Sequence, residues 1–84
     1  MSPLRKLPNI GDVLADKLEQ VGIDDEKKLK VIGSEKAFLL VKEVDPKACI
    51  SHLYAIEGAV QGVRWHTLPI GKKNELKDFF DLCK

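Results

Sequence analysis

Apolar residues recur every three or four positions along most of this chain, and glycine or proline separates the stretches that carry the pattern. Such spacing places apolar side chains on one face of an α-helix, so the pattern predicts five or six short helices. No stretch alternates apolar and polar residues with a period of two, so no strand is expected. We therefore predict an all-α fold, a compact bundle of about five short helices.

In the first half of the chain, the pattern predicts one turn and two helices. The turn covers residues 3–7 with Ser2 as its cap, and the first longer helix covers about residues 11–21. Either Asp24 or Asp25 caps the next helix, which runs to about residue 31. Glycines that are typical of helix C-caps follow these segments at Gly22 and Gly33.

Three more helices are expected in the second half. One spans residues 34–44 and buries a stripe that includes Val44. Asp45-Pro46 is a helix-start signal, because Asp accepts bonds from free amides and Pro needs no amide partner in a first turn. The next helix is therefore predicted over residues 46–60, with Cys49 buried, Gly62 as its end, and Gly58 and Ala59 open to a neighbouring helix. The last helix spans about residues 72–82, with Leu76, Phe79, Phe80 and Cys83 facing the core.

The size and charge of the chain restrict its function. Its 84 residues fit one domain, residues 1–84, and 14 Lys and Arg against 13 Asp and Glu leave a net charge of +1. This balance is far from that of a dedicated nucleic-acid binder, so any DNA contact must come from local geometry. Two cysteines without CxxC spacing are interpreted as reduced core residues, which favours a cytoplasmic protein. No apolar run approaches the roughly 20 residues that span a bilayer, so neither a membrane span nor an export signal is expected.

The segment most informative about chemistry is Leu7-Pro8-Asn9-Ile10-Gly11, which leads into the helix over residues 11–21. It resembles a helix-hairpin-helix motif, whose two glycine-like positions and later small residue are matched by Asn9, Gly11 and Ala15. Asn and Gly tolerate the left-handed backbone that the hairpin needs, and the free helix N-terminus after it favours an anion. The resemblance implies that hairpin amides hold one DNA backbone phosphate. The candidate nucleic-acid-binding residues, including supporting cations, are Arg5, Lys6, Asn9, Ile10, Gly11, Val13 and Lys17.

A purely structural role for this hairpin stays open. Asp12 and Asp16 lie in the first turns of the helix, where each carboxylate would repel a phosphate. The hairpin would then be a corner that packs Leu7, Ile10 and Leu14 into the core.

Three other groups of residues have a functional and a structural interpretation. Arg64-Trp65-His66 is either a binding hot spot or, as we favour, part of the core packing. A basic group consists of Lys72, Lys73 and Lys77 with Arg64. It is either an electropositive edge that would bind phosphates or an acidic partner, or a solvated face that also carries interleaved acids. Cys49 and His52 lie three apart on a predicted helix, without an orienting third group. We therefore expect no enzyme activity, no metal site and no cofactor.

Over nearly its full length, the chain resembles the C-terminal domain of the TfoX/Sxy family, bacterial regulators associated with natural competence. The resemblance rests on residues 7–11 and 18–23, on Asp45-Pro46 with Ala48-Cys49, and on residues 53–59 followed by 62–66. It implies a helical fold related to helix-hairpin-helix domains, a link to DNA or transcription regulation, and no catalytic residues. Larger family members add an N-terminal domain that this chain lacks, so a stand-alone paralogue is expected.

Two functions therefore remain open at this point. The first is a binding module that contacts DNA weakly and without sequence preference, or contacts a protein, in bacterial regulation. The second is a protein-protein interaction or homodimerisation domain without nucleic-acid contact.

Overall fold

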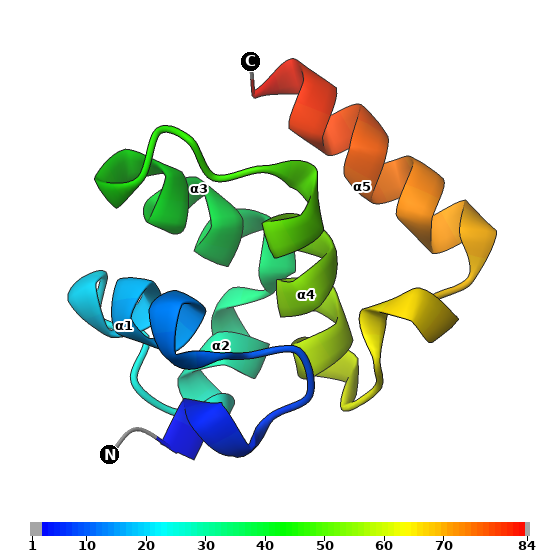
Figure 1. Ribbon diagram of the computed structural model, residues 1–84. Helices are drawn as coiled ribbons and strands as arrows, with labels where there is room; N and C mark the ends of the chain where they lie inside the picture. Colours follow the sequence, from blue (N-terminus) through cyan, green and yellow to red (C-terminus); the bar gives the residue numbers. More distant parts are fainter. Residues whose placement is uncertain (1–2, 84) are drawn as a thin grey trace.

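The computed structural model describes residues 3–83, which form five α-helices and two short 3-10 helices and contain no strand (Figure 1). This confirms the predicted all-α bundle, whereas the predicted cap Ser2 lies outside the described residues. No helix within that range is both long and apolar enough to cross a bilayer. The elements in order are η1 (Pro3–Lys6), α1 (Asp12–Gln20), α2 (Glu26–Ile32), α3 (Ser34–Val44), α4 (Ile50–Gln61), η2 (Trp65–Thr67) and α5 (Ile70–Leu82).

Helix α4 is the centre of the packing. It contacts α2, α3, α5 and η2, and in Figure 1 it stands between α3 and α5. Five consecutive residues, from Ala55 to Ala59, are buried, so neighbours surround this helix on most sides. A helix in that position must be apolar around most of its circumference, which fits a segment whose single charged residue is Glu57. Its fully buried Leu53 and Ile56 belong to the same core as Phe38 of α3 and Leu76 of α5.

Glycines follow the ends of three helices, as predicted. Gly22, Gly33 and Gly62 have positive φ angles of 88°, 85° and 75°, a backbone conformation that side chains disfavour. At the start of α2, the Asp25 side chain accepts a hydrogen bond from the Lys28 amide at 2.7 Å. Asp25, rather than Asp24, is therefore the N-cap.

The prediction that a helix begins at Pro46 is wrong. The Asp45 side chain accepts from the Lys47 amide at 3.1 Å, and the Ala48 amide donates to the Asp45 carbonyl at 3.0 Å, so this segment is a turn. Helix α4 begins at Ile50, with Cys49 as its N-cap. Cys49 is consequently exposed instead of buried. Val44, predicted to be buried, is 45% exposed because α3 ends there.

Candidate binding surface

The hairpin before α1 has the predicted left-handed residue at one of its two expected positions. Asn9 has a φ of 70°, whereas Gly11 is extended with a φ of −92° and serves as the N-cap of α1. The prediction of left-handed backbone at Gly11 is therefore wrong. Ile10 and Leu14 are buried, and the Ile10 amide donates to the Leu7 carbonyl at 3.4 Å. The hairpin thus packs as a corner of the core.

The side chain of Asn9 connects the hairpin to the segment that follows α4. Its Nδ2 donates to the Val63 carbonyl at 2.9 Å, and its Oδ1 accepts from the Trp65 amide at 3.1 Å. Gly58 of α4 makes this approach possible, since a Cβ there would lie 2.4 Å from Asn9 Nδ2 and 2.8 Å from the Val63 carbonyl oxygen. The Asn9 side chain and the start of η2 at Trp65 approach Gly58 closely, whereas none of the three atoms nearest to that Cβ position belongs to an α-helix.

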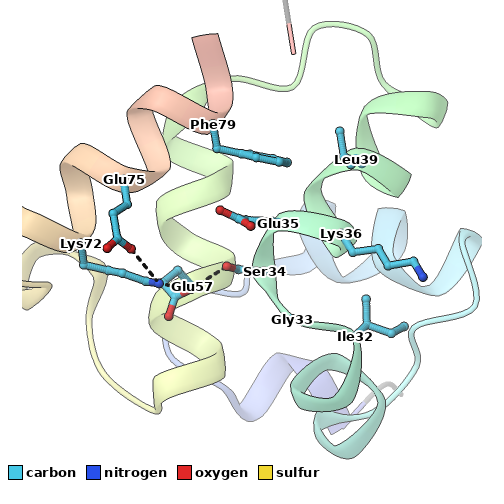
Figure 2. A pocket seen from close by; sticks show the side chains of 10 residues that line it. All are labelled: Ile32, Gly33, Ser34, Glu35, Lys36, Leu39, Glu57, Lys72, Glu75 and Phe79. Carbon is cyan, nitrogen blue, oxygen red and sulfur yellow. Dashed lines mark hydrogen bonds and ion pairs between the residues drawn. The ribbon is translucent and has the colours of Figure 1, made fainter. Parts of the chain in front are cut away.

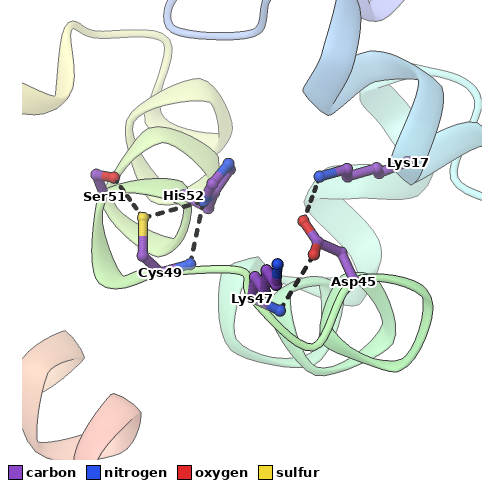
Figure 3. Close-up of polar contacts among 6 residues, drawn as sticks. All are labelled: Lys17, Asp45, Lys47, Cys49, Ser51 and His52. Carbon is purple, nitrogen blue, oxygen red and sulfur yellow. Dashed lines mark hydrogen bonds and ion pairs between the residues drawn. The ribbon is translucent and has the colours of Figure 1, made fainter.

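Two of the three cations predicted to support phosphate binding form ion pairs with carboxylates. Arg5 Nε lies 3.0 Å from Asp12 Oδ1, and its Nη2 donates to Asp16 Oδ1 at 2.9 Å. Lys17 pairs with Asp45, and its hydrogen bond holds the pKa of the Asp45 carboxyl below the ordinary value (Figure 3). Lys6 is exposed, and within residues 3–83 no carboxylate forms an ion pair with it.

The remaining predicted residue, Val13, is 64% exposed in the first turn of α1. No side chain caps this helix. Val13 lines a shallow pocket of about 320 Å³ together with Asn9, Gly11, Ser51 and His52. The structure therefore brings the hairpin residues close to the start of α4, a neighbourhood that spacing along the sequence did not indicate.

A cysteine, a serine and a histidine gather at that end of α4 (Figure 3). Cys49 Sγ lies 2.8 Å from Ser51 Oγ and 3.3 Å from His52 Nδ1, and the Cys49 amide donates to His52 Nδ1 at 3.1 Å. The hydrogen bond with Ser51 lowers the pKa of the Cys49 thiol below its ordinary value. Cys49 and His52 also form a capping box, so their proximity follows from the way α4 begins. Within the described residues, no group of three metal-ligating side chains occurs.

Trp65 lies in a stack of aromatic side chains over α4. Its ring stacks on Tyr54 with centroids 5.5 Å apart and on His66 at 4.0 Å. Lys73 Nζ lies 5.7 Å from the Trp65 ring centroid, and the Tyr54 hydroxyl donates to the Lys73 carbonyl at 3.4 Å. Trp65 is only half-buried, so it is part of the packing and also reaches the surface.

A groove of about 700 Å³ separates the start of α3 from α5 (Figure 2). Its floor carries Glu57, whose side chain is 9% exposed. Ser34 Oγ donates to Glu57 Oε1 at 2.5 Å, Gln61 Nε2 donates to Oε2 at 2.6 Å, and Lys72 Nζ lies 3.9 Å from Oε1. A buried carboxylate is tolerated only with such partners, so Glu57 ties α4 to the starts of α3 and α5. Our sequence interpretation missed this residue, although a lone acid within an apolar helix signals a buried polar contact.

Comparisons with known proteins agree over most of the chain. The model of the TfoX C-terminal domain family matches residues 1–80. Protein Sxy of Escherichia coli strain K12 is 30% identical over 78 residues, which cover 93% of this chain and 37% of that protein. The chain thus spans little more than a third of this curated relative.

Two crystal structures from Listeria monocytogenes have the same fold. An uncharacterized protein in a triclinic crystal form is 51% identical, with a TM-score of 0.94 over 95% of this chain and 91% of that one. A protein of unknown function in a tetragonal form is 50% identical, with a TM-score of 0.93 over 95% and 99% of the two chains.

Proposed function

Because this chain belongs to the family of TfoX C-terminal domains, we propose that it is a non-enzymatic module of bacterial regulation that acts by binding another protein. Natural competence is the regulated process that the family resemblance implies. That resemblance supplies no catalytic residues, and the Cys49–His52 pair is explained by the capping of α4. Both points support a binding role over catalysis.

The charge of the hairpin region favours a protein over DNA as the binding partner. Arg5, Lys6 and Lys17 supply three positive charges. Arg5 forms ion pairs with Asp12 and Asp16, and Lys17 forms one with Asp45, so three negative charges lie in the same region. The local sum is zero, and two of these acids lie within the first turns of α1, where they oppose the attraction of a helix N-terminus for an anion.

The size of the repulsion supports the same choice. Two unit charges 4 Å apart interact with about 1 kcal/mol in water and about 4 kcal/mol near a protein surface. The side chains of Asp12 and Asp16 are 85% and 60% exposed, so each would repel a nearby phosphate with an energy closer to the value in water. Non-specific DNA binding depends almost wholly on an excess of positive charge, which the hairpin lacks.

A titration of labelled duplex DNA, followed by fluorescence anisotropy at low and then moderate salt, tests this proposal. We expect no binding tighter than about 10⁻⁴ M at low salt. The matched variant is Gly11→Glu, since Gly11 has an extended backbone and a Cβ added there would meet no atom within 4 Å. Binding at about 10⁻⁴ to 10⁻⁶ M that weakens with salt and is lost in Gly11→Glu would overturn the proposal in favour of phosphate binding.

A further inference from the structure

The segment around η2 is positively charged and lacks local acids. From Gly58 to Asn74 the chain contains no Asp or Glu, but it contains the cations Arg64, Lys72 and Lys73 as well as His66. Lys72 lies 3.4 Å from Glu75 and 3.9 Å from Glu57, so it belongs to the groove. Within residues 3–83, no carboxylate forms an ion pair with the other three.

Arg64 and Lys73 accompany a side-chain arrangement that hydrogen bonds and ring contacts hold in place. The Trp65 ring stacks on Tyr54 and on His66, and its amide donates to Asn9. Lys73 Nζ donates to the His66 carbonyl at 3.2 Å, which holds the ammonium near the Trp65 ring. Binding to a preorganised surface loses little side-chain entropy, and Trp and Arg are the residues most enriched at binding hot spots.

Exposed aliphatic side chains lie beside the cations. Ile70 is 78% exposed and Val63 is 37% exposed. Ile70 and Lys73 are three residues apart on α5, so they share one face of that helix. An aliphatic group next to a cation suits a protein partner that offers both an apolar side chain and a carboxylate, whereas a phosphate backbone would use only the cations.

We propose that Val63, Arg64, Trp65, His66, Ile70 and Lys73, here termed the Trp65 face, bind an acidic peptide segment of a partner protein that carries large apolar side chains among its carboxylates. This inference rests on the proposed protein-binding function and names the site and the class of partner. Charge complementarity gives the specificity, and Trp65 with Ile70 supplies the apolar contact.

Selection of displayed random peptides on the intact protein tests this inference. The retained peptides should be enriched in Asp and Glu and should carry a large apolar residue. Arg64→Glu with Lys73→Glu should weaken the best peptide by about tenfold or more. The matched control is Lys27→Glu with Lys47→Glu, which makes the same charge change at exposed lysines elsewhere and should leave affinity nearly unchanged. Circular dichroism checks that both variants fold.

The contrary outcomes separate this inference from the proposed function. Retained peptides without acidic enrichment, or equal weakening by the two double variants, would overturn the Trp65 face and leave a protein-binding module in place. Retention of no peptide would overturn the inference as well. Competition for this face by duplex DNA would overturn both proposals. A dimer that Arg64→Glu with Lys73→Glu dissociates would instead assign the face to a second copy of the chain.

Discussion

Replacing Phe38 by alanine is expected to destabilise the protein by about 3–5 kcal/mol, the usual loss for a buried phenylalanine. Phe38 is fully buried on α3, and its ring lies 5.8 Å from that of Phe80 on α5. The substitution removes a contact between two helices and leaves a cavity beside α4. Because domains of this size have total stabilities near the low end of about 5–15 kcal/mol, a large share of the molecules should be unfolded at physiological temperature.

Chemical denaturation followed by far-ultraviolet circular dichroism measures this loss. Leu39→Ala is the control, because Leu39 is the next residue of the same helix and is 42% exposed. We expect it to change stability by less than about 1 kcal/mol. Equal losses in the two variants would contradict the assignment of Phe38 to the core.

The second large effect is expected for Gly58→Ala. A new Cβ would lie 2.4 Å from Asn9 Nδ2, 2.8 Å from the Val63 carbonyl oxygen and 3.0 Å from the Trp65 amide. The loop and hairpin must move apart, and the two hydrogen bonds of Asn9 are lost. Overpacking costs about 1–3 kcal/mol and each bond about 1 kcal/mol, whereas alanine gains about 1 kcal/mol in helix propensity. The net destabilisation should be about 2–4 kcal/mol, which corresponds to a fall in Tm of roughly 8–30 °C.

Gly71→Ala is the matched control for that substitution. Gly71 also lies within a helix, α5, but nothing stands within 4 Å of the position of its Cβ. Alanine there should stabilise the protein by up to about 1 kcal/mol through helix propensity. Thermal denaturation should show a lower Tm for Gly58→Ala and a higher Tm for Gly71→Ala. A change in Tm of the same sign in both variants would contradict the close contacts described at Gly58.

The regular parts of the fold were predictable because local signals determine them. Gly22, Gly33 and Gly62 end helices in the backbone conformation that glycine favours. The same kind of signal failed at Asp45-Pro46, since an Asp side chain caps a turn as readily as a helix. The real start of α4 depends on Cys49 and His52 bonding to each other's backbone, a pairing that is rare enough not to be expected from sequence.

The candidate site was less predictable because its contacts join distant parts of the chain. The prediction of a left-handed Asn9 was correct, but its side chain binds partners 54 and 56 residues away. Arg5 was expected to support an anion, yet its guanidinium meets Asp16, 11 residues along the chain. Both pairings depend on tertiary packing, which the spacing of residues along the chain does not reveal. The DNA-binding roles assigned to the seven residues stay predictions.

The most direct test of the account is whether removing the hairpin carboxylates creates an affinity for DNA. Asp12→Asn with Asp16→Asn preserves the shape of both side chains and changes the local charge from zero to +2, because Arg5 and Lys6 are then unopposed while Lys17 keeps Asp45. In the anisotropy titration at low salt, we predict salt-sensitive binding at about 10⁻⁴ to 10⁻⁶ M for this variant and none for the wild-type protein. Equal binding by the two proteins would contradict the account, because the acids would then have no influence on the phosphate.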